Sequence, residues 1–324
     1  MDVLIVKLGA AGDVVRTTTL LRSLCGEITW LTDTKNTVLL KDVPQDVRCF
    51  SWEERDSCRD RKYDLVINLE DGFEVATYLS GLDYRRLWGA QLGSDDSVVY
   101  TEDSRCWFDL SIVSRHGRQQ ADELKLANRS TYQELIFQGL RLRFSGETYL
   151  LPPTPRSQLT GDVAIASEAG PVWPMKKWAF YDELQQKLEA AGLVVNLLPK
   201  RPSLLEHLAD VCGHRCLVSG DTLPMHFALG SGIPCVSLFT CTSPWEIHEY
   251  GLQKKIVSPV LREFFYQRGY DHRATAAISV EEVLAACMQQ LERGKSGHLQ
   301  QEESNVSNTS RMKKPGRTAK GSTC

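Results

Sequence analysis

One stretch of the chain, residues 218–251, constrains the fold more than any other. It reads as the end of a strand, a tight turn, a short helix, a second strand at 234–239 and a polar loop. Asp221 or Thr222 can cap the helix, and Pro224 is tolerated in its first turn. The helix therefore begins at the carboxyl end of a strand, which is where open α/β sheets bind anionic ligands. Thr222 and His226 are four residues apart, so both can face one ligand.

A second turn of this kind lies near the start of the chain. The apolar residues 3–8 read as a buried strand, the small residues 9–12 as a turn, and residues 14–24 as a helix. Gly9 and Gly12 do not complete the G-x-G-x-x-G dinucleotide fingerprint, but they let the backbone approach a ligand closely. Asp13 stands at the start of the helix. Local sequence leaves two interpretations of Asp13 open, a simple helix N-cap or a functional carboxylate.

Strands and helices alternate along most of the chain. Strands are predicted at 28–32, 47–50, 64–69, 162–166, 194–198 and 215–218, with helices at 73–82, 132–140, 180–191, 204–212 and 279–291. This alternation predicts an α/β protein with mostly parallel sheets. A proline-rich connector at 150–155 predicts a boundary between domains 1–150 and 151–293. Residues 294–324 have scarcely an apolar side chain, so we predict a disordered tail.

Several motifs together resemble one family. SGDTLPMHFALGSGIPCVSLFTCTSPWEIHEYG, KLGAAGDV, YDLVINL, DELK with TYQE, and PMKKW are similar to segments of glycosyltransferase family 9, the ADP-heptose:lipopolysaccharide heptosyltransferases and their relatives. The resemblance covers roughly residues 1–293. The competing interpretation is an ordinary βαβ crossover of some other α/β enzyme, and it accounts for one short motif better than for a whole run.

The resemblance implies a GT-B fold, with two Rossmann-like domains that face a central cleft. The first domain would bind the acceptor and the second the nucleotide sugar. Asp13 matches the proposed general base of the family, and the donor-binding positions are Lys176, Asp221, Thr222, Leu223 and His226. Supporting roles fall on Lys7, Gly12, Lys177 and Thr242. A lysine pair in a turn is more often simply solvated, but a lysine there can also neutralise a departing diphosphate.

The function implied is inverting sugar transfer in lipopolysaccharide biosynthesis, with ADP-heptose as the expected donor and a surface-glycan or lipopolysaccharide-core hydroxyl as the acceptor. No Asp-x-Asp pattern occurs in the chain, so we expect neither a metal nor another cofactor. Two alternatives remain open. A GT-B epimerase would turn over the sugar nucleotide without an acceptor, and a catalytically idle binding protein would hold it without turnover.

Bulk composition narrows the partners and the compartment. A net charge of -3 argues against nucleic-acid binding. Ten cysteines without zinc-like spacing indicate free thiols in a reducing compartment. The chain starts with a strand rather than a signal peptide, and no apolar run approaches the length of a membrane span. We therefore predict a cytoplasmic protein that binds a nucleotide sugar and a glycan or glycolipid, with peripheral contact to the inner membrane surface.

Overall fold

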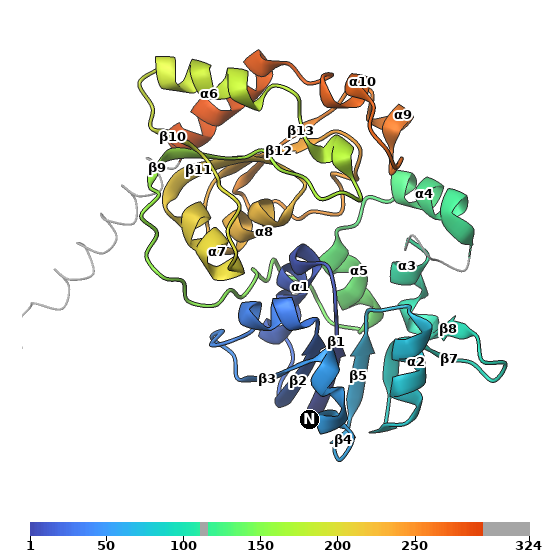
Figure 1. Ribbon diagram of the computed structural model, residues 1–324. Helices are drawn as coiled ribbons and strands as arrows, with labels where there is room; N and C mark the ends of the chain where they lie inside the picture. Colours follow the sequence, from blue (N-terminus) through green and yellow to red (C-terminus); the bar gives the residue numbers. More distant parts are fainter. Residues whose placement is uncertain (111–115, 294–324) are drawn as a thin grey trace, which may run out of the picture.

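The computed structural model describes residues 1–110 and 116–293, which form two parallel sheets one after the other along the chain (Figure 1). The first sheet has the strand order β3-β2-β1-β5-β7-β8, and only the β7–β8 pair is antiparallel. Its strands are β1 (Asp2–Val6), β2 (Glu27–Thr32), β3 (Val47–Ser51), β5 (Leu65–Asn68), β7 (Leu87–Leu92) and β8 (Val98–Tyr100). A separate short pair is formed by β4 (Lys62–Tyr63) and β6 (Asp83–Tyr84).

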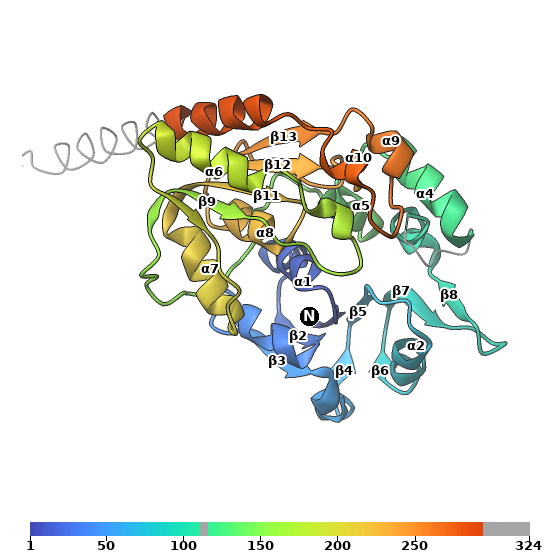
Figure 2. The same cartoon turned by 45° about the horizontal axis from the view of Figure 1, so that its top comes forward.

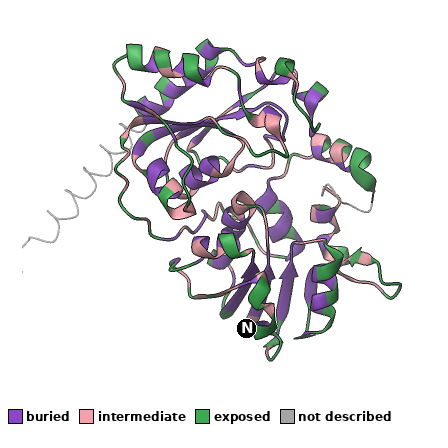
Figure 3. Ribbon diagram, viewed as in Figure 1, coloured by how far each residue is buried: buried purple, intermediate pink, exposed green. Residues whose placement is uncertain are grey.

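The central strands of this sheet are covered on both faces. Residues 3–6 of β1 have no exposed surface, and Figure 3 shows the central strands of both sheets as buried. That explains why their sequence is a continuous apolar run rather than an alternating one. The helical segments of the first half are α1 (Ala11–Thr17), η1 (Thr18–Arg22), η2 (Thr34–Leu39), η3 (Trp52–Cys58), α2 (Phe73–Ser80), η4 (Glu102–Ser104), α3 (Arg105–Phe108), α4 (Gly117–Ala127) and α5 (Tyr132–Gly139), and α4 packs on the second half rather than on this sheet.

The second sheet is wholly parallel and has the order β10-β9-β11-β12-β13. Its strands are β9 (Gly161–Ala166), β10 (Val195–Leu197), β11 (His214–Gly220), β12 (Cys235–Phe239) and β13 (Gln253–Val257). Around them lie η5 (Pro174–Lys176), α6 (Tyr181–Ala190), α7 (Leu204–Cys212), α8 (Leu223–Gly230), α9 (Leu261–Phe264), α10 (His272–Thr275) and a helix of residues 280–293. Trp178 is buried in this core, where its indole N–H donates to Ile278 O.

The two sheets meet across α1, α5 and α8, which lie between them in both views (Figures 1 and 2). Val15 of α1 and Met225 of α8 belong to one buried hydrophobic cluster. The Tyr132 N–H donates to Glu246 O at 3.0 Å, which ties the start of α5 to the second half of the chain. The segments that follow the carboxyl ends of β1 and β11 therefore lie close together, since α1 and α8 pack against each other.

These features confirm the predicted doubly wound α/β class. The two sheets lie on either side of the proline-rich connector, while the exact division into domains 1–150 and 151–293 stays a prediction. The predicted disordered tail lies outside the described residues. Among the described residues, five strands were not predicted: the short pair β4 and β6, and β7, β8 and β13. Within the described part of the chain, no helix has the length and apolar character needed to cross a membrane.

Candidate active site

Both sheets reverse their strand order at a point where ligands bind in open α/β folds. In the first sheet the reversal lies between β1 and β5. The segments that follow these two strands, which carry Gly12 and Glu70, therefore lie next to each other. In the second it lies between β9 and β11, which places the segment leading to Lys176 beside Asp221. The two reversal points face each other, and two cavities lie there.

The first cavity, called here the inter-sheet cavity, has a volume of about 380 Å³. The starts of α1 and α8 both line it, and so do charged side chains from both halves. The charged members are Asp13, Arg16, Lys125, Lys176, Asp221 and Glu246. The second, called the N-terminal cavity, has about 270 Å³ and is lined by the first half of the chain together with Glu246. Asp13, Arg16, Lys125 and Glu246 line both cavities.

Lys176 is held at the wall of the inter-sheet cavity by Asp221. Its ammonium donates to Asp221 O at 2.7 Å and to Asp221 Oδ2 at 2.9 Å, and the Thr242 hydroxyl donates to the same Oδ2 at 2.7 Å. Burial opposes ionisation of Asp221, but the charge of Lys176 outweighs it and lowers the pKa of Asp221 to about 2. The lysine can reach this position only because Gly220 has no side chain, since a Cβ there would lie 2.5 Å from Lys176 O. Lys176 is thus a fixed positive charge beside the start of α8.

His226 packs directly against Gly12. A Cβ on Gly12 would lie 2.9 Å from His226 Cδ2, so α1 and α8 approach this closely only with glycine there. Burial and the nearby Arg16 lower the pKa of His226 to about 4, which keeps the ring neutral at pH 7. His226 Nδ1 and Thr222 Oγ1 are both buried without a hydrogen-bond partner in the protein. Unpaired groups of this kind cost about 1–3 kcal/mol each and are typical of sites where a ligand supplies the partner.

Asp13 lies where the two cavities meet. Its carboxylate accepts from Arg16 Nη2 at 2.8 Å, and the Arg16 guanidinium stacks 3.7 Å above the centre of the Tyr132 ring. Burial would raise the pKa of Asp13, but Arg16 and Lys7 outweigh it and hold the pKa below its ordinary value. Asp13 is therefore an ionised carboxylate with one oxygen on Arg16 and about a third of its side chain exposed.

The N-terminal cavity contains a second buried ion pair. Glu70 Oε1 accepts from Lys7 Nζ and from the Leu8 N–H, each at 2.7 Å. A third pair links Lys125 to Glu246 at 3.8 Å. Burial would lower the pKa of Lys7, but Asp13 and Glu70 raise it above its ordinary value. The charges of this cavity are thus arranged as pairs of opposite sign.

Most of the predicted site residues come together here. Gly12, Asp13, Lys176, Asp221, Thr222, Leu223 and His226 line the inter-sheet cavity. Lys7 lines the N-terminal cavity instead, and Thr242 acts from behind through Asp221. Lys177 is placed differently from the prediction, because it points to Glu168 at 2.9 Å with half of its side chain exposed.

The structure also corrects the capping predictions. Ala10 is the N-cap of α1, so Asp13 is the third residue of the helix and does not cap it. Thr222 is the N-cap of α8, but neither its hydroxyl nor the Asp221 carboxylate caps the helix with a side-chain hydrogen bond. The polar side chains at both turns are therefore directed to ion pairs, or left without a partner, at the cavity walls.

Several charged residues of the site were missed, among them Arg16, Glu70 and Glu246. Arg16 was detectable, because it stands three residues after Asp13 on the same helix. Glu70 was detectable as an acid just beyond the carboxyl end of a buried strand. No sequence pattern indicates that Glu246 belongs to the site. It lies in an irregular segment after β12 and contacts Lys125 only in the folded protein.

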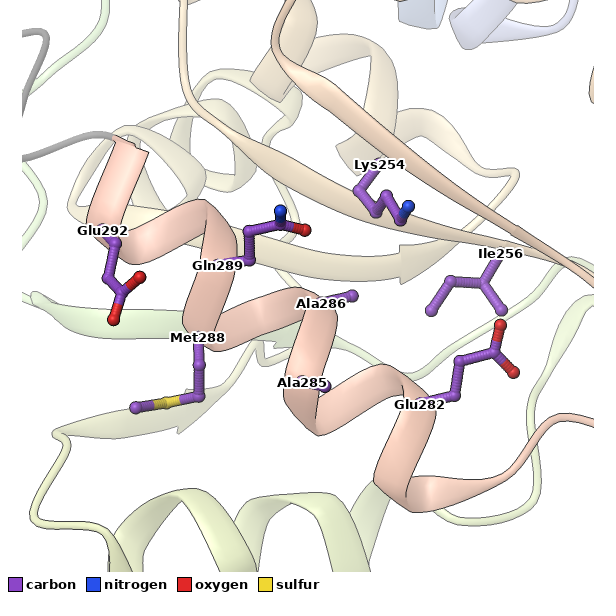
Figure 4. Close-up of a pocket in the computed structure, with 8 residues that line it drawn as sticks. All are labelled: Lys254, Ile256, Glu282, Ala285, Ala286, Met288, Gln289 and Glu292. Atoms are coloured by element: carbon purple, nitrogen blue, oxygen red, sulfur yellow. The ribbon is translucent and has the colours of Figure 1, made fainter.

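A further hollow of about 550 Å³ lies on the second half of the molecule, between β13 and the helix of residues 280–293 (Figure 4). It is lined by Lys254, Ile256, Glu282, Ala285, Ala286, Met288, Gln289 and Glu292. None of the predicted site residues lies there, and its wall comes from one strand and one helix only. The candidate active site is therefore the pair of cavities around Asp13.

Comparison with known proteins connects this geometry to one group of structures. Neither a scan against protein-family models nor a search of curated proteins gave a match. Solved structures do match. The E. coli ADP-heptose lipopolysaccharide heptosyltransferase II superposes with a TM-score of 0.61 at 16% identity, over 91% of this chain and 100% of that one. The chain has a GT-B fold.

Two other structures give the same result. The glycosyltransferase family 9 protein from Veillonella parvula matches with a TM-score of 0.59 at 16% identity, over 90% of this chain and 97% of that chain. The E. coli heptosyltransferase WaaC, solved with ADP-2-deoxy-2-fluoro heptose, matches with a TM-score of 0.54 at 15% identity, over 90% and 99% of the two chains. The match spans nearly the whole length of each of these proteins, so the likeness of fold includes both sheets.

Proposed function

We propose that this protein is an inverting glycosyltransferase that moves a sugar from a nucleotide sugar to a hydroxyl group of a glycan. One observation carries the proposal: an ionised carboxylate, Asp13, lies at the junction of two cavities. One of them has a fixed lysine and a helix start in its wall, which suits a diphosphate. A base between a donor and an acceptor site is what a direct displacement requires.

In this mechanism the donor diphosphate lies in the inter-sheet cavity, against Lys176 and the first turn of α8. The acceptor hydroxyl reaches Asp13 from the N-terminal cavity. The hydroxyl oxygen attacks the anomeric carbon as the bond to the diphosphate breaks, and Asp13 takes the hydroxyl proton. A positioned base of this kind contributes roughly 10²–10⁴ in rate. The attack on the face opposite the leaving group inverts the anomeric centre.

The leaving diphosphate is stabilised by protein groups. Lys176, Arg16 and Lys125 all line the inter-sheet cavity, and Lys176 is fixed there by Asp221. A helix N-terminus contributes roughly 0.3–2 kcal/mol toward a nearby anion. We propose that these groups suffice and that transfer needs no divalent metal or other cofactor.

ADP-heptose is the first donor to test, because a matching structure carries an ADP-heptose analogue in its name. The sequence resemblance supports the same choice, and a lipopolysaccharide-core or other surface glycan as the acceptor. We also propose that the protein acts in the cytoplasm, with peripheral contact to the inner membrane surface.

The test is a thermal-shift screen of ADP-, UDP- and GDP-sugars, followed by an assay of donor consumption with and without glycan acceptors. We expect one nucleotide sugar to raise the melting temperature, and its consumption to require an acceptor. The anomeric configuration of the product, determined by NMR, should be opposite to that of the donor. Isomerisation of the donor without an acceptor would instead indicate an epimerase, and binding without turnover would indicate an idle binding protein.

A further inference from the structure

The inter-sheet cavity has an apolar part beside its charged one. Val172, Trp173 and Tyr266 line it and are called here the aromatic wall. Val172 is 54% exposed and Trp173 is partly exposed, so both offer apolar surface to a ligand. The Trp173 ring meets the Tyr266 ring edge to face, with 5.4 Å between the ring centres and 84° between the planes.

Packing between two segments of the second half brings the aromatic wall together. Trp173 directly precedes η5, and Tyr266 follows shortly after α9. Met175 of η5 and Phe264 of α9 belong to one small buried cluster, which fixes these segments against each other. Trp173 itself packs on the neighbouring cluster that contains Tyr266. The core of the second half therefore sets the position of the wall.

Tyr266 is held in a backbone conformation that side chains other than glycine rarely adopt. Its φ is +50°, in the left-handed region. The Tyr266 N–H donates to Cys241 O at 2.8 Å, and the Tyr266 carbonyl accepts from Arg118 Nη2 at 2.7 Å. Such a conformation costs free energy that the surrounding structure must offset, and it is found most often at ligand sites. The two hydrogen bonds thus hold the Tyr266 ring at the cavity.

The aromatic wall lies between the two ends of the site. At one end, Trp173 begins the turn of Lys176, whose N–H donates to Trp173 O at 3.1 Å. At the other end, Tyr266 contacts two residues that line both cavities. Lys125 Nζ lies 4.2 Å from the centre of the Tyr266 ring, and the Tyr266 hydroxyl donates to Glu246 Oε1 at 3.4 Å. The order along the wall is therefore Lys176, Trp173, Tyr266 and then the shared residues.

We infer that the aromatic wall binds the sugar of the nucleotide sugar, and that Trp173 makes the protein favour a nucleotide sugar over the free nucleoside diphosphate. This inference rests on the proposed function, in which the diphosphate lies at Lys176 and the acceptor enters from the N-terminal cavity. The sugar that is transferred must then lie between them, beside the aromatic wall. A sugar ring has an apolar face of C–H groups, which packs on the indole, and a polar edge of hydroxyl groups, which is left for the charged side chains.

The experiment compares nucleoside diphosphates with their sugars by calorimetry on the full-length protein, without acceptor. The probes are ADP with ADP-heptose, UDP with UDP-glucose and GDP with GDP-mannose, and the variants are tested with the pair whose nucleotide sugar binds the parent most tightly. Trp173→Leu should raise the Kd of the nucleotide sugar about 2- to 10-fold more than the Kd of the diphosphate. An equal loss for both ligands, or no loss for either, would overturn the inference. The failure of every nucleotide sugar to bind at millimolar concentration would overturn it too.

Trp245→Leu is the matched control. Trp245 packs on the same cluster as Trp173, but Arg129 lies 3.9 Å above its ring, and it is not among the described residues that line the inter-sheet cavity. This variant should leave the ratio of the two Kd values unchanged. A ratio that falls equally in the Trp173 and Trp245 variants would refute a direct contact between Trp173 and the sugar.

Melting curves identify any variant that fails to fold. If Trp173→Leu is one of these, saturation-transfer NMR on the parent protein decides the question. Irradiation of the aromatic protons of the protein should saturate the C–H protons of the bound sugar. A bound nucleotide sugar whose sugar protons receive no saturation would overturn the inference.

The outcome is separable from that of the proposed function. Binding is measured without acceptor or turnover, so a fall in the ratio supports the sugar contact even where no transfer occurs, and the absence of transfer refutes the proposed function alone. Conversely, a protein that transfers sugar, but in which Trp173→Leu weakens both ligands equally, keeps the proposed function and refutes the contact.

Discussion

Replacing Asp13 with asparagine separates a catalytic base from a structural carboxylate. Asparagine keeps the shape and can still accept a hydrogen bond from Arg16, but it cannot take a proton from the acceptor. We expect kcat to fall by at least roughly 10²-fold while donor affinity changes little, because the base acts only in the transition state.

The stability cost follows from the ion pair rather than from a helix cap. Asp13 is the third residue of α1 and pairs with Arg16 at 2.8 Å, with 35% of its own side chain and 14% of that of Arg16 exposed. Such a pair lies between an exposed one, at about 0–1 kcal/mol, and a fully buried one, at about 3–5 kcal/mol. We therefore expect a loss of about 1–2 kcal/mol, which lowers the melting temperature by about 2–8 °C. The variant stays folded at 25 °C.

A matched control is Asp210→Asn. Asp210 accepts from Arg201 Nε at 2.6 Å and from the Ser157 hydroxyl at 2.6 Å, and it lines neither cavity. The Asp210→Asn variant should lose at least as much stability as Asp13→Asn and should keep the parent kcat. Donor binding is measured by calorimetry, transfer by product formation, and stability by thermal melting. A folded Asp13→Asn protein with nearly the parent kcat would refute the assignment of Asp13 as the base.

Other predictions concern the groups around Asp13. Replacing Lys176 by methionine together with His226 by glutamine should weaken binding of the cognate nucleotide sugar at least about 10-fold in calorimetry, and unchanged affinity would contradict the placement of the diphosphate. Transfer should continue in EDTA, and activity that is lost and then restored by magnesium or manganese would contradict the metal-free mechanism. The acidic limb of the kcat/KM profile should lie below the ordinary pKa of an aspartate, because Arg16 and Lys7 lower the pKa of Asp13. Arg16→Met removes the nearest cation, so this limb should move to higher pH, and a limb that stays in place would show that Arg16 does not tune Asp13. Gly12→Ala forces a contact with His226 and should reduce donor binding more than stability, as calorimetry and melting curves would show.

The strand and turn pattern of the fold was predictable because buried parallel strands are short apolar runs. Residues 3–6, 65–68 and 235–239 all read as such runs, and all are strands. The strand β13 was missed because Gln253, Lys254 and Lys255 make it polar, which is tolerated at the edge of a sheet. The strand β7 was missed because glycine interrupts it. Gly89 has φ +124° there, and a Cβ would lie 1.9 Å from Asn68 O.

The first helix illustrates a limit of periodicity. A helix over 14–24 was predicted from its apolar spacing, but the α-helix ends at Thr17 and a tighter 3₁₀ segment follows. The threonine hydroxyls explain the change. Thr17 Oγ1 donates to Asp13 O and Thr18 Oγ1 to Val15 O, each at 2.6 Å, so side chains compete for the helix carbonyls. Apolar periodicity does not register this competition.

The residues of the site were predictable only where one turn carries them. Asp13 with Gly12, and Asp221 with His226, are neighbours in sequence, so a motif shows them. The contacts of Arg16 with Tyr132 and of Lys125 with Glu246 join residues more than a hundred positions apart. No rule based on sequence spacing predicts contacts between residues so far apart. These side chains meet because α5 packs against α1, and because the second half of the chain packs against α1 and α5.

In the mechanism that we propose, the charges around Asp13 also make the strength of the base depend on the donor. Arg16, Lys7 and Lys176 lower the pKa of Asp13, which keeps it ionised but makes it a weak proton acceptor. A bound diphosphate places negative charge beside Lys176 and the start of α8, and so offsets the field of these cations at Asp13. The pKa of Asp13 then rises toward the range in which it accepts the acceptor proton more readily. If Asp13 is the base, it accepts a proton poorly until the donor is bound, and the proposed mechanism then favours an acceptor that binds after the nucleotide sugar.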